Sequence, residues 1–93
     1  MTMNRLTTVE AVQFTSLDQD CIDQLNLITK NNLSKILRHT KDGQPAIYLT
    51  PKEHIVLREN ILLQYQWLVR IGDNLYDVLN YTDFNKLRKE WEL

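Results

Sequence analysis

The chain has 93 residues, which is enough for one domain with a modest hydrophobic core. Its composition is that of a globular protein rather than a disordered one, because 43% of the residues are hydrophobic and 25% are charged. Eleven basic and twelve acidic side chains give a net charge of −1. A general DNA- or RNA-binding protein would need a clear basic surplus, so we predict one domain over residues 1–93 without general nucleic-acid binding.

Cysteine content and hydropathy indicate a protein of a reducing compartment. Cys21 is the only cysteine, so neither an intramolecular disulfide nor a zinc site built from cysteines can form. The first residues contain no apolar run of the kind found in signal peptides, and the later apolar stretches are too short to cross a bilayer. We therefore expect an intracellular protein that does not contact a membrane.

The amino-terminal part is predicted to form a strand followed by a helix. Within residues 7–14, Val9 and Ala11 alternate with polar and β-branched residues, which is typical of a strand. Ser16 and Gln19 have the spacing of a capping box at the start of a helix. The residues expected on the apolar face of this helix, which would end within the polar segment 30–32, are Leu17, Cys21, Ile22, Leu25 and Ile28.

A second hairpin is predicted in the middle of the chain. The segment 33–40 also fits a helical turn, but the turn at 41–44 and the apolar run after it favour two strands. Pro45 would begin the second strand, where its missing N–H is tolerated. The next segment gives conflicting signals, because Thr50-Pro51 is a good helix start whereas residues 54–57 are β-like. We expect a short helical turn or a loop there, followed by a strand that leads into the next hairpin.

The strongest local signal is a hairpin within residues 61–81. Its two arms alternate with a period of two on either side of Gly72-Asp73-Asn74, a short loop of turn-forming residues. Thr82 is placed to cap a last helix, whose apolar stripe is formed by Phe84, Leu87 and Trp91. The predicted fold class is therefore α+β: a small antiparallel sheet of about four to six strands, with a helix after the first strand and a C-terminal helix.

Catalytic and metal-binding signatures are absent from the sequence. Neither His39 nor His54 has a second ligand at a metal-site spacing, and the serines lie in no nucleophile motif. Cys21 falls on the apolar helix face and is predicted to be a buried thiol. With two glycines the chain has no glycine-rich phosphate loop. We predict that the protein is not an enzyme and that it uses no cofactor or metal.

Aromatic and arginine side chains remain as candidates for binding. For Trp67 and Tyr76 a core position is favoured. The alternative is a binding role, because aromatic rings can also stack a planar ligand. Arg70 leaves its strand with Leu68, on the face opposite Trp67, and an exposed or interface salt bridge is favoured over a ligand contact. Arg38 lies in a basic run that is predicted to be a solvated edge, with phosphate contact as the alternative.

Both ends of the chain resemble a family of small tailed-phage proteins. Members begin with a basic run and an IEAVQW-like strand, and they close with a pattern like GDWIIKG, GEFYPC and DIFE. The matching residues here are Arg5, Val9-Glu10-Ala11-Val12-Gln13-Phe14, Gln66-Trp67-Leu68-Val69-Arg70, Gly72, Tyr76-Asp77-Val78, Asp83-Phe84 and Trp91-Glu92. Gln66 stands where the family has Asp, and the middle segment 34–60 is unlike the family pattern.

The resemblance implies a function as well as a fold. Small phage proteins of this kind include anti-CBASS sponges, which bind cyclic dinucleotide immune signals without cleaving them. The resemblance also implies that the protein is a homo-oligomer, a tetramer, that acts in the host bacterial cytoplasm. The residues expected to contact a nucleotide signal are Gln13, Trp67, Arg70, Tyr76 and Arg38. The alternatives are a protein–protein inhibitor that docks on a host enzyme or defence complex through the hairpin edge, and a minor virion protein.

Overall fold

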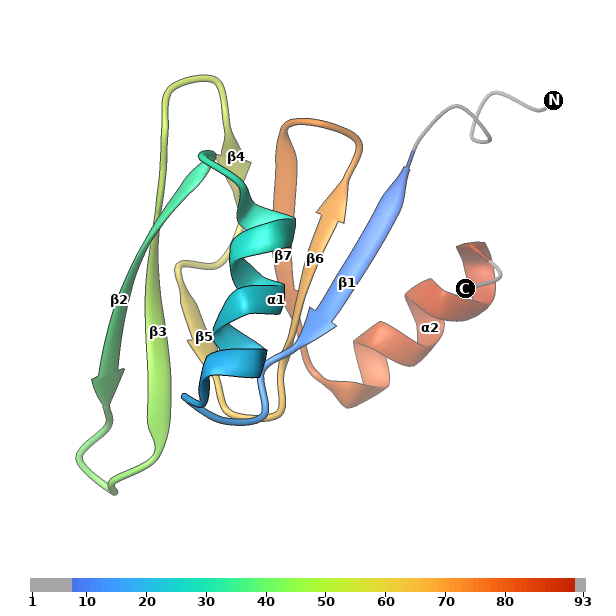
Figure 1. Cartoon of the computed structure of the whole chain (residues 1–93). Helices are drawn as coiled ribbons and strands as arrows, with labels where there is room; N and C mark the ends of the chain where they lie inside the picture. The colour runs from blue at the N-terminus through green and yellow to red at the C-terminus, as the bar shows by residue number, and fades with distance from the viewer. Residues whose placement is uncertain (1–7, 92–93) are drawn as a thin grey trace, which may run out of the picture.

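The computed structural model describes residues 8–91 and has the predicted α+β fold (Figure 1). The elements are, in chain order, β1 (Val9–Gln13), α1 (Gln19–Thr29), β2 (Leu33–His39), β3 (Pro45–Pro51), β4 (Val56–Leu57), β5 (Ile61–Leu63), β6 (Trp67–Ile71), β7 (Leu75–Leu79) and α2 (Tyr81–Trp91). The helix after the first strand and the C-terminal helix are both confirmed. Residue 7, the first of the predicted strand, lies outside the described residues.

A four-stranded sheet has the order β1-β6-β7-β4. Its centre is the predicted hairpin, in which Trp67 pairs with Leu79 and Ile71 pairs with Leu75. Gly72 opens the connecting turn with φ of 68°, a conformation that glycine adopts without steric cost. The hairpin prediction is therefore confirmed, and its position between β1 and β4 places both of its arms inside the sheet.

The remaining strands form a separate three-stranded sheet with the order β2-β3-β5. The hairpin interpretation of the middle segment is confirmed, since His39 pairs with Pro45 at the turn and Leu33 pairs with Pro51 at the far end. Gly43, at φ of 81°, donates its amide to the carbonyl of Thr40 at 2.9 Å and closes the turn. The prediction of a single antiparallel sheet is corrected, because the structure has seven strands divided between two sheets.

The segment between β3 and β4 explains why the strands form two sheets and not one. Of the helical turn and the loop expected after Thr50-Pro51, the loop forms and the expected strand, β4, follows it, because β3 continues through Pro51 and the Lys52 amide bonds to the Asn32 carbonyl at 2.9 Å. A turn at His54, with φ of 73°, then brings β4 alongside β7 in a parallel pairing. This long-range parallel contact is independent of the local patterns that predict hairpins.

Helix α1 is capped by a different residue than predicted. The carboxylate of Asp18 accepts the amide of Cys21 at 3.0 Å, while the Gln19 side chain bonds to Asp23 instead of returning to Ser16. The capping-box prediction is therefore wrong. Asp18 takes the role because its extended backbone places a charged acceptor at the positive end of the helix dipole.

The apolar face of α1 forms one core with both sheets. Members of this cluster include Leu25 and Ile28 from α1, Leu68 and Tyr76 from the larger sheet, and Ile47 from the smaller sheet. Because the two sheets share this core, neither would bury its apolar face without α1.

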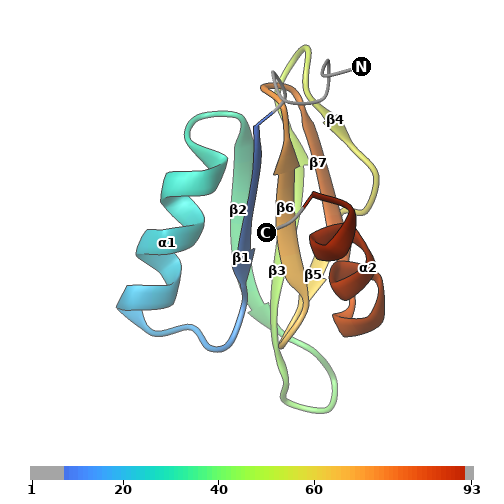
Figure 2. The same ribbon diagram turned by 90° about the vertical axis from the view of Figure 1, so that its right-hand side faces the viewer.

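Helix α2 covers the other side of the larger sheet, so that α1 and α2 flank the strands (Figure 2). Its main anchor is Phe84, which is only 6% exposed. Asn80, not the predicted Thr82, caps the helix by accepting the Asp83 amide at 2.8 Å. The side chain of Trp91, the last residue of the predicted stripe, lies outside the described residues. Within residues 8–91, no helix has the length and apolar character needed to span a membrane.

Candidate functional site

Arg70 lies in a buried ion pair at the centre of the larger sheet. Its guanidinium bonds to the carboxylate of Glu10, its partner on β1, and donates to the Gly72 carbonyl at 2.8 Å. The hydrogen bond to Glu10 is the main cause that raises the pKa of Arg70 above its usual value. Arg70 does leave the strand on the face opposite Trp67 and forms a salt bridge, as predicted, but it is 7% exposed and therefore lies in the interior and not at an exposed position.

Tyr76 is a core residue with both of its hydrogen-bonding roles filled. The ring is fully buried, the hydroxyl donates to the Ile28 carbonyl at 2.9 Å, and it accepts from the Asn32 amide at 3.1 Å. These bonds tie β7 to the end of α1. Neither Tyr76 nor Arg70 therefore presents a free polar group to a ligand at the surface.

Trp67 and Gln13 are brought together as cross-strand partners. The indole of Trp67 stacks on Phe84 with ring centroids 3.8 Å apart and an interplanar angle of 5°. One face of the indole is therefore occupied by α2. Gln13 donates its side-chain amide to the Tyr65 carbonyl at 3.1 Å.

The hollow beside these two residues carries negative charge. It has a volume of about 360 Å³ and is lined by Trp67, Gln13, Asp18 and Asp20, among others. The pKa of Asp18 is lowered, first by the Cys21 amide and then by Ser16, so this carboxylate is charged at neutral pH. An anionic phosphate is disfavoured here because two carboxylates face it without a lysine or arginine in the lining.

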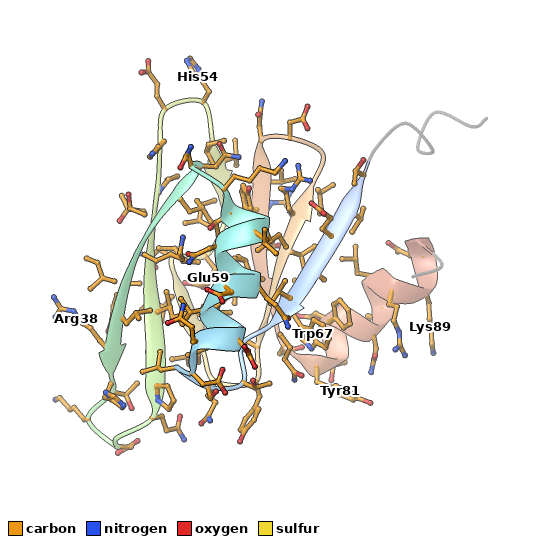
Figure 3. All side chains as sticks on the ribbon, viewed as in Figure 1. Arg38, His54, Glu59, Trp67, Tyr81 and Lys89 are labelled. Atoms are coloured by element: carbon orange, nitrogen blue, oxygen red, sulfur yellow. The ribbon has the colours of Figure 1, made fainter. Side chains whose placement is uncertain are left out.

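Arg38 lies at the edge of the molecule formed by β2, well separated from Trp67 (Figure 3). It belongs to β2, and its guanidinium carbon is 5.8 Å from the centroid of the Tyr48 ring on β3. This geometry is a cation–π contact at an exposed site. Its neighbour Lys35 is turned inward and donates to the Thr29 hydroxyl at 2.8 Å, and burial lowers the pKa of Lys35.

The contact between Arg38 and Tyr48 borders a second hollow, which we call the Arg38 hollow. It has a volume of about 410 Å³, and its lining residues are Ile36, Arg38, Tyr48, Leu49, Thr50 and Asn60. Arg38 is the only charged residue in that lining, so the local charge is positive. The half-exposed ring of Tyr48 also borders a further hollow of about 410 Å³ that contains Glu59 and Asp83.

Sequence reasoning identified Arg38 but missed the other residues of this hollow. Tyr48, on β3, is not among the five residues predicted to contact a ligand. Its alternation with the buried Ile47 and Leu49 in β3 is the signal that it faces outward. The approach of Asn60 could not be predicted, because it depends on β5 pairing with β3.

Metal-binding geometry is not found in the described part of the chain. No group of three or more histidine, cysteine or acidic side chains comes together within residues 8–91. The single cysteine, Cys21, is buried with its thiol against the Gln13 carbonyl at 3.6 Å.

Comparisons with known proteins do not indicate a function for these surfaces. No protein-family model matches the chain, and no curated protein or solved structure matches it either.

Proposed function

We propose that this chain is a phage-encoded anti-defence protein that binds a nucleotide immune signal of the cyclic dinucleotide type and sequesters it without cleavage. The proposed place of action is the host bacterial cytoplasm. Both the phage context and the ligand class come from the sequence resemblance, and one structural observation supports the ligand class. That observation is the Arg38 cation beside the exposed ring of Tyr48, at a hollow without acidic residues.

The Arg38 hollow has the two components that nucleotide binding needs. An exposed aromatic ring can stack a base, which is worth about 1–3 kcal/mol per base, and a guanidinium can pair with a phosphate through two parallel hydrogen bonds. Thr50 and Asn60 add groups that can bond to base edges or sugar hydroxyls. Of the five residues predicted to contact the ligand, Arg38 is therefore the one on which this proposal depends.

The test is a thermal-shift and calorimetry series with cyclic dinucleotides that differ in their bases. A ligand that binds only the folded state at 100 times its Kd stabilises it by about 2.7 kcal/mol, so at least one member should raise Tm. Arg38→Ala and Tyr48→Ala should each weaken binding at least tenfold. Arg88→Ala, which removes an exposed arginine from α2, is the matched control and should bind normally.

Two outcomes would contradict the proposal. Binding of no cyclic dinucleotide would remove the ligand class, and equal affinity of the Arg38→Ala and Arg88→Ala proteins would remove the site. The bound nucleotide should also be recovered with unchanged mass after long incubation, since sequestration leaves the ligand intact.

A protein–protein inhibitor is the second candidate. The predicted docking through the edge of the β6–β7 hairpin is corrected, because β1 and β4 pair with its two arms, but the edge of β2 is free and favours the same function. No other strand among residues 8–91 pairs with the outer side of β2, where Ile36 is 50% and Leu37 is 47% exposed. An extended segment of a host protein could add to this edge. Pulldown of one stoichiometric host protein from bacterial lysate, lost in Leu37→Asp, would support inhibition over nucleotide binding.

A further inference from the structure

The free edge of β1 is a second surface on which a partner could bind, and the proposed nucleotide site does not include it. Gly72 donates to the Thr8 carbonyl at 2.7 Å and Phe14 donates to the Gln66 carbonyl at 2.9 Å, so the even-numbered residues of this segment face β6. Backbone groups alternate along a strand, and those of Val9, Ala11 and Gln13 therefore point away from the sheet. No described strand pairs with that side of β1.

A groove follows this free edge between β1 and α1. It consists of two hollows of about 360 Å³ and 370 Å³, which share Ala11, Val12 and Gln24 in their linings. Because the two hollows adjoin at these residues, an extended chain could run along β1 with α1 as its second wall. An edge strand beside a helix is a geometry in which peptides bind by adding a strand to the sheet.

The charge of the groove determines the kind of peptide that it fits. Asp18 and Asp20 belong to its lining together with Glu10, whose carboxylate is paired with Arg70, and none of the lining residues is a lysine or arginine. An acidic segment would meet like charges at close range, whereas lysine or arginine would be attracted. Apolar contact is available as well, since Leu27 of α1 is 75% exposed and lines one hollow.

Trp67 lies at the other end of the groove and has an unpaired donor. Its indole Nε1 is buried without a hydrogen-bond partner among the described residues, although such groups are nearly always satisfied in folded proteins. Trp67 also lines the hollow that contains Asp18 and Asp20.

We propose that the groove between β1 and α1 binds an extended basic segment of a partner protein, which adds a strand to the free edge of β1. Backbone bonds to Val9, Ala11 and Gln13 supply the pairing, and basic side chains reach the carboxylates of Asp18 and Asp20. This surface is opposite in charge to the Arg38 hollow. The two surfaces therefore bind different partners, and neither proposal depends on the other.

The test uses fluorescent peptides of alternating sequence, Lys-Val-Lys-Leu-Lys-Val, with Glu-Val-Glu-Leu-Glu-Val as the matched control. Fluorescence anisotropy should show binding of the basic peptide, weaker binding as salt rises, and none of the acidic peptide. N-methylation of alternate amides distinguishes strand addition from simple charge attraction. Methylation of the amides that face β1 should abolish binding, and methylation of the other set should leave it unchanged.

Substitutions on the protein locate the groove. Asp20→Lys should weaken the basic peptide at least tenfold, while Asp23→Lys is the control, since Asp23 is also an exposed acid of α1 but does not line the groove. Circular dichroism checks that both variants fold. Arg38→Ala should leave peptide affinity unchanged, because Arg38 does not line the groove. The peptide test therefore remains valid even if no cyclic dinucleotide binds.

Several results would overturn the proposal. They are equal binding of the basic and acidic peptides, equal effects of the two methylation patterns, and equal affinities of the Asp20→Lys and Asp23→Lys proteins. A stable dimer of this chain that pairs through β1 and resists displacement by the basic peptide would assign the edge to a second copy instead.

Discussion

At the scale of single residues, the ion pair between Arg70 and Glu10 explains why an arginine lies in the middle of the best strand. The Arg70 side chain is 8% exposed, whereas that of Glu10 is 49% exposed, so the two partners lose very different amounts of hydration. Removing the buried partner lets the other return to water, but removing Glu10 leaves the buried guanidinium with only the exposed carboxylate of Asp73, at 3.7 Å, as an ionic partner. The pair is therefore asymmetric in its contribution to stability.

We predict that Glu10→Ala lowers the free energy of unfolding by about 3 kcal/mol, near the lower end of values for breaking a buried pair. Arg70→Met keeps an apolar stem in the sheet and should change it by less than about 1 kcal/mol. Urea unfolding of both variants measures this. A larger loss for Arg70→Met than for Glu10→Ala would contradict the asymmetry, and loss of nucleotide binding in the folded Arg70→Met protein would restore Arg70 as a ligand contact.

Asp18 makes a pH-dependent contribution to stability through its cap on α1. Its pKa in the folded state is below the ordinary value of 3.8, because the Cys21 amide donates to the charged carboxylate. The stabilisation is therefore present above pH 3.8 and is lost as pH falls through the folded pKa. We expect Asp18→Asn to have a lower Tm than the parent at pH 7, and the difference to shrink at pH 3. A difference that grows in acid would contradict this.

At the scale of elements, α2 is attached to the sheet mainly through the stacked pair of Phe84 and Trp67. Phe84 is the one buried hydrophobic residue of α2 within the described chain, and Leu87 is only partly buried. Other hydrophobic side chains of the helix therefore cannot replace its contribution. Trp67 lies in a strand and Phe84 in a helix, as the sequence predicts. The contact between these two residues is not predicted by the sequence.

Phe84→Ala should lower the free energy of unfolding by about 3–4 kcal/mol, as expected for a buried phenylalanine. Release of α2 should also expose the indole of Trp67 and shift its fluorescence emission to longer wavelength. Leu87→Ala is the control on the same helix and should cost less. An unchanged emission spectrum in a folded Phe84→Ala protein would show that α2 is held by other contacts.

At the scale of the whole molecule, the outer face of the smaller sheet presents apolar side chains to solvent. Ile36, Tyr48 and Leu63 are 50%, 39% and 36% exposed on neighbouring strands, and a small core of this kind gains stability when such surface is buried by assembly. This face supports the homo-oligomer that the sequence resemblance implies, and because Ile36 and Tyr48 also line the Arg38 hollow, assembly through it would place that hollow at the boundary between subunits.

We therefore predict that native mass spectrometry detects an assembly, with a tetramer as the expected state. Ile36→Lys should reduce the assembly to smaller species, because it places a charge in the apolar face. Since Ile36 is exposed, the stability of the subunit should change by no more than about 0.5 kcal/mol. A wild-type chain that remains monomeric at high concentration would contradict the prediction.

The sequence by itself determined the elements whose signals are local. The apolar face of α1 follows the 3.6-residue period, and both hairpins follow a period of two around turns at Gly43 and Gly72. Helix caps were less predictable, because Asp18 and Asn80 compete with neighbouring Ser16 and Thr82 for the same orphan amides. Which residue caps each helix depends on the local backbone geometry, and the sequence pattern does not specify that geometry.

Only the tertiary structure decided how these elements divide into two sheets and which candidate residues remain accessible. The parallel pairing of β4 with β7 and the bond from Arg70 to Glu10, 60 positions away, follow from burying both sheets under one helix. That packing encloses Tyr76 and Arg70 but leaves Arg38 beside the exposed ring of Tyr48. Local periodicity specifies which face of a strand is apolar, whereas the free energy of the whole core determines which strands that face meets.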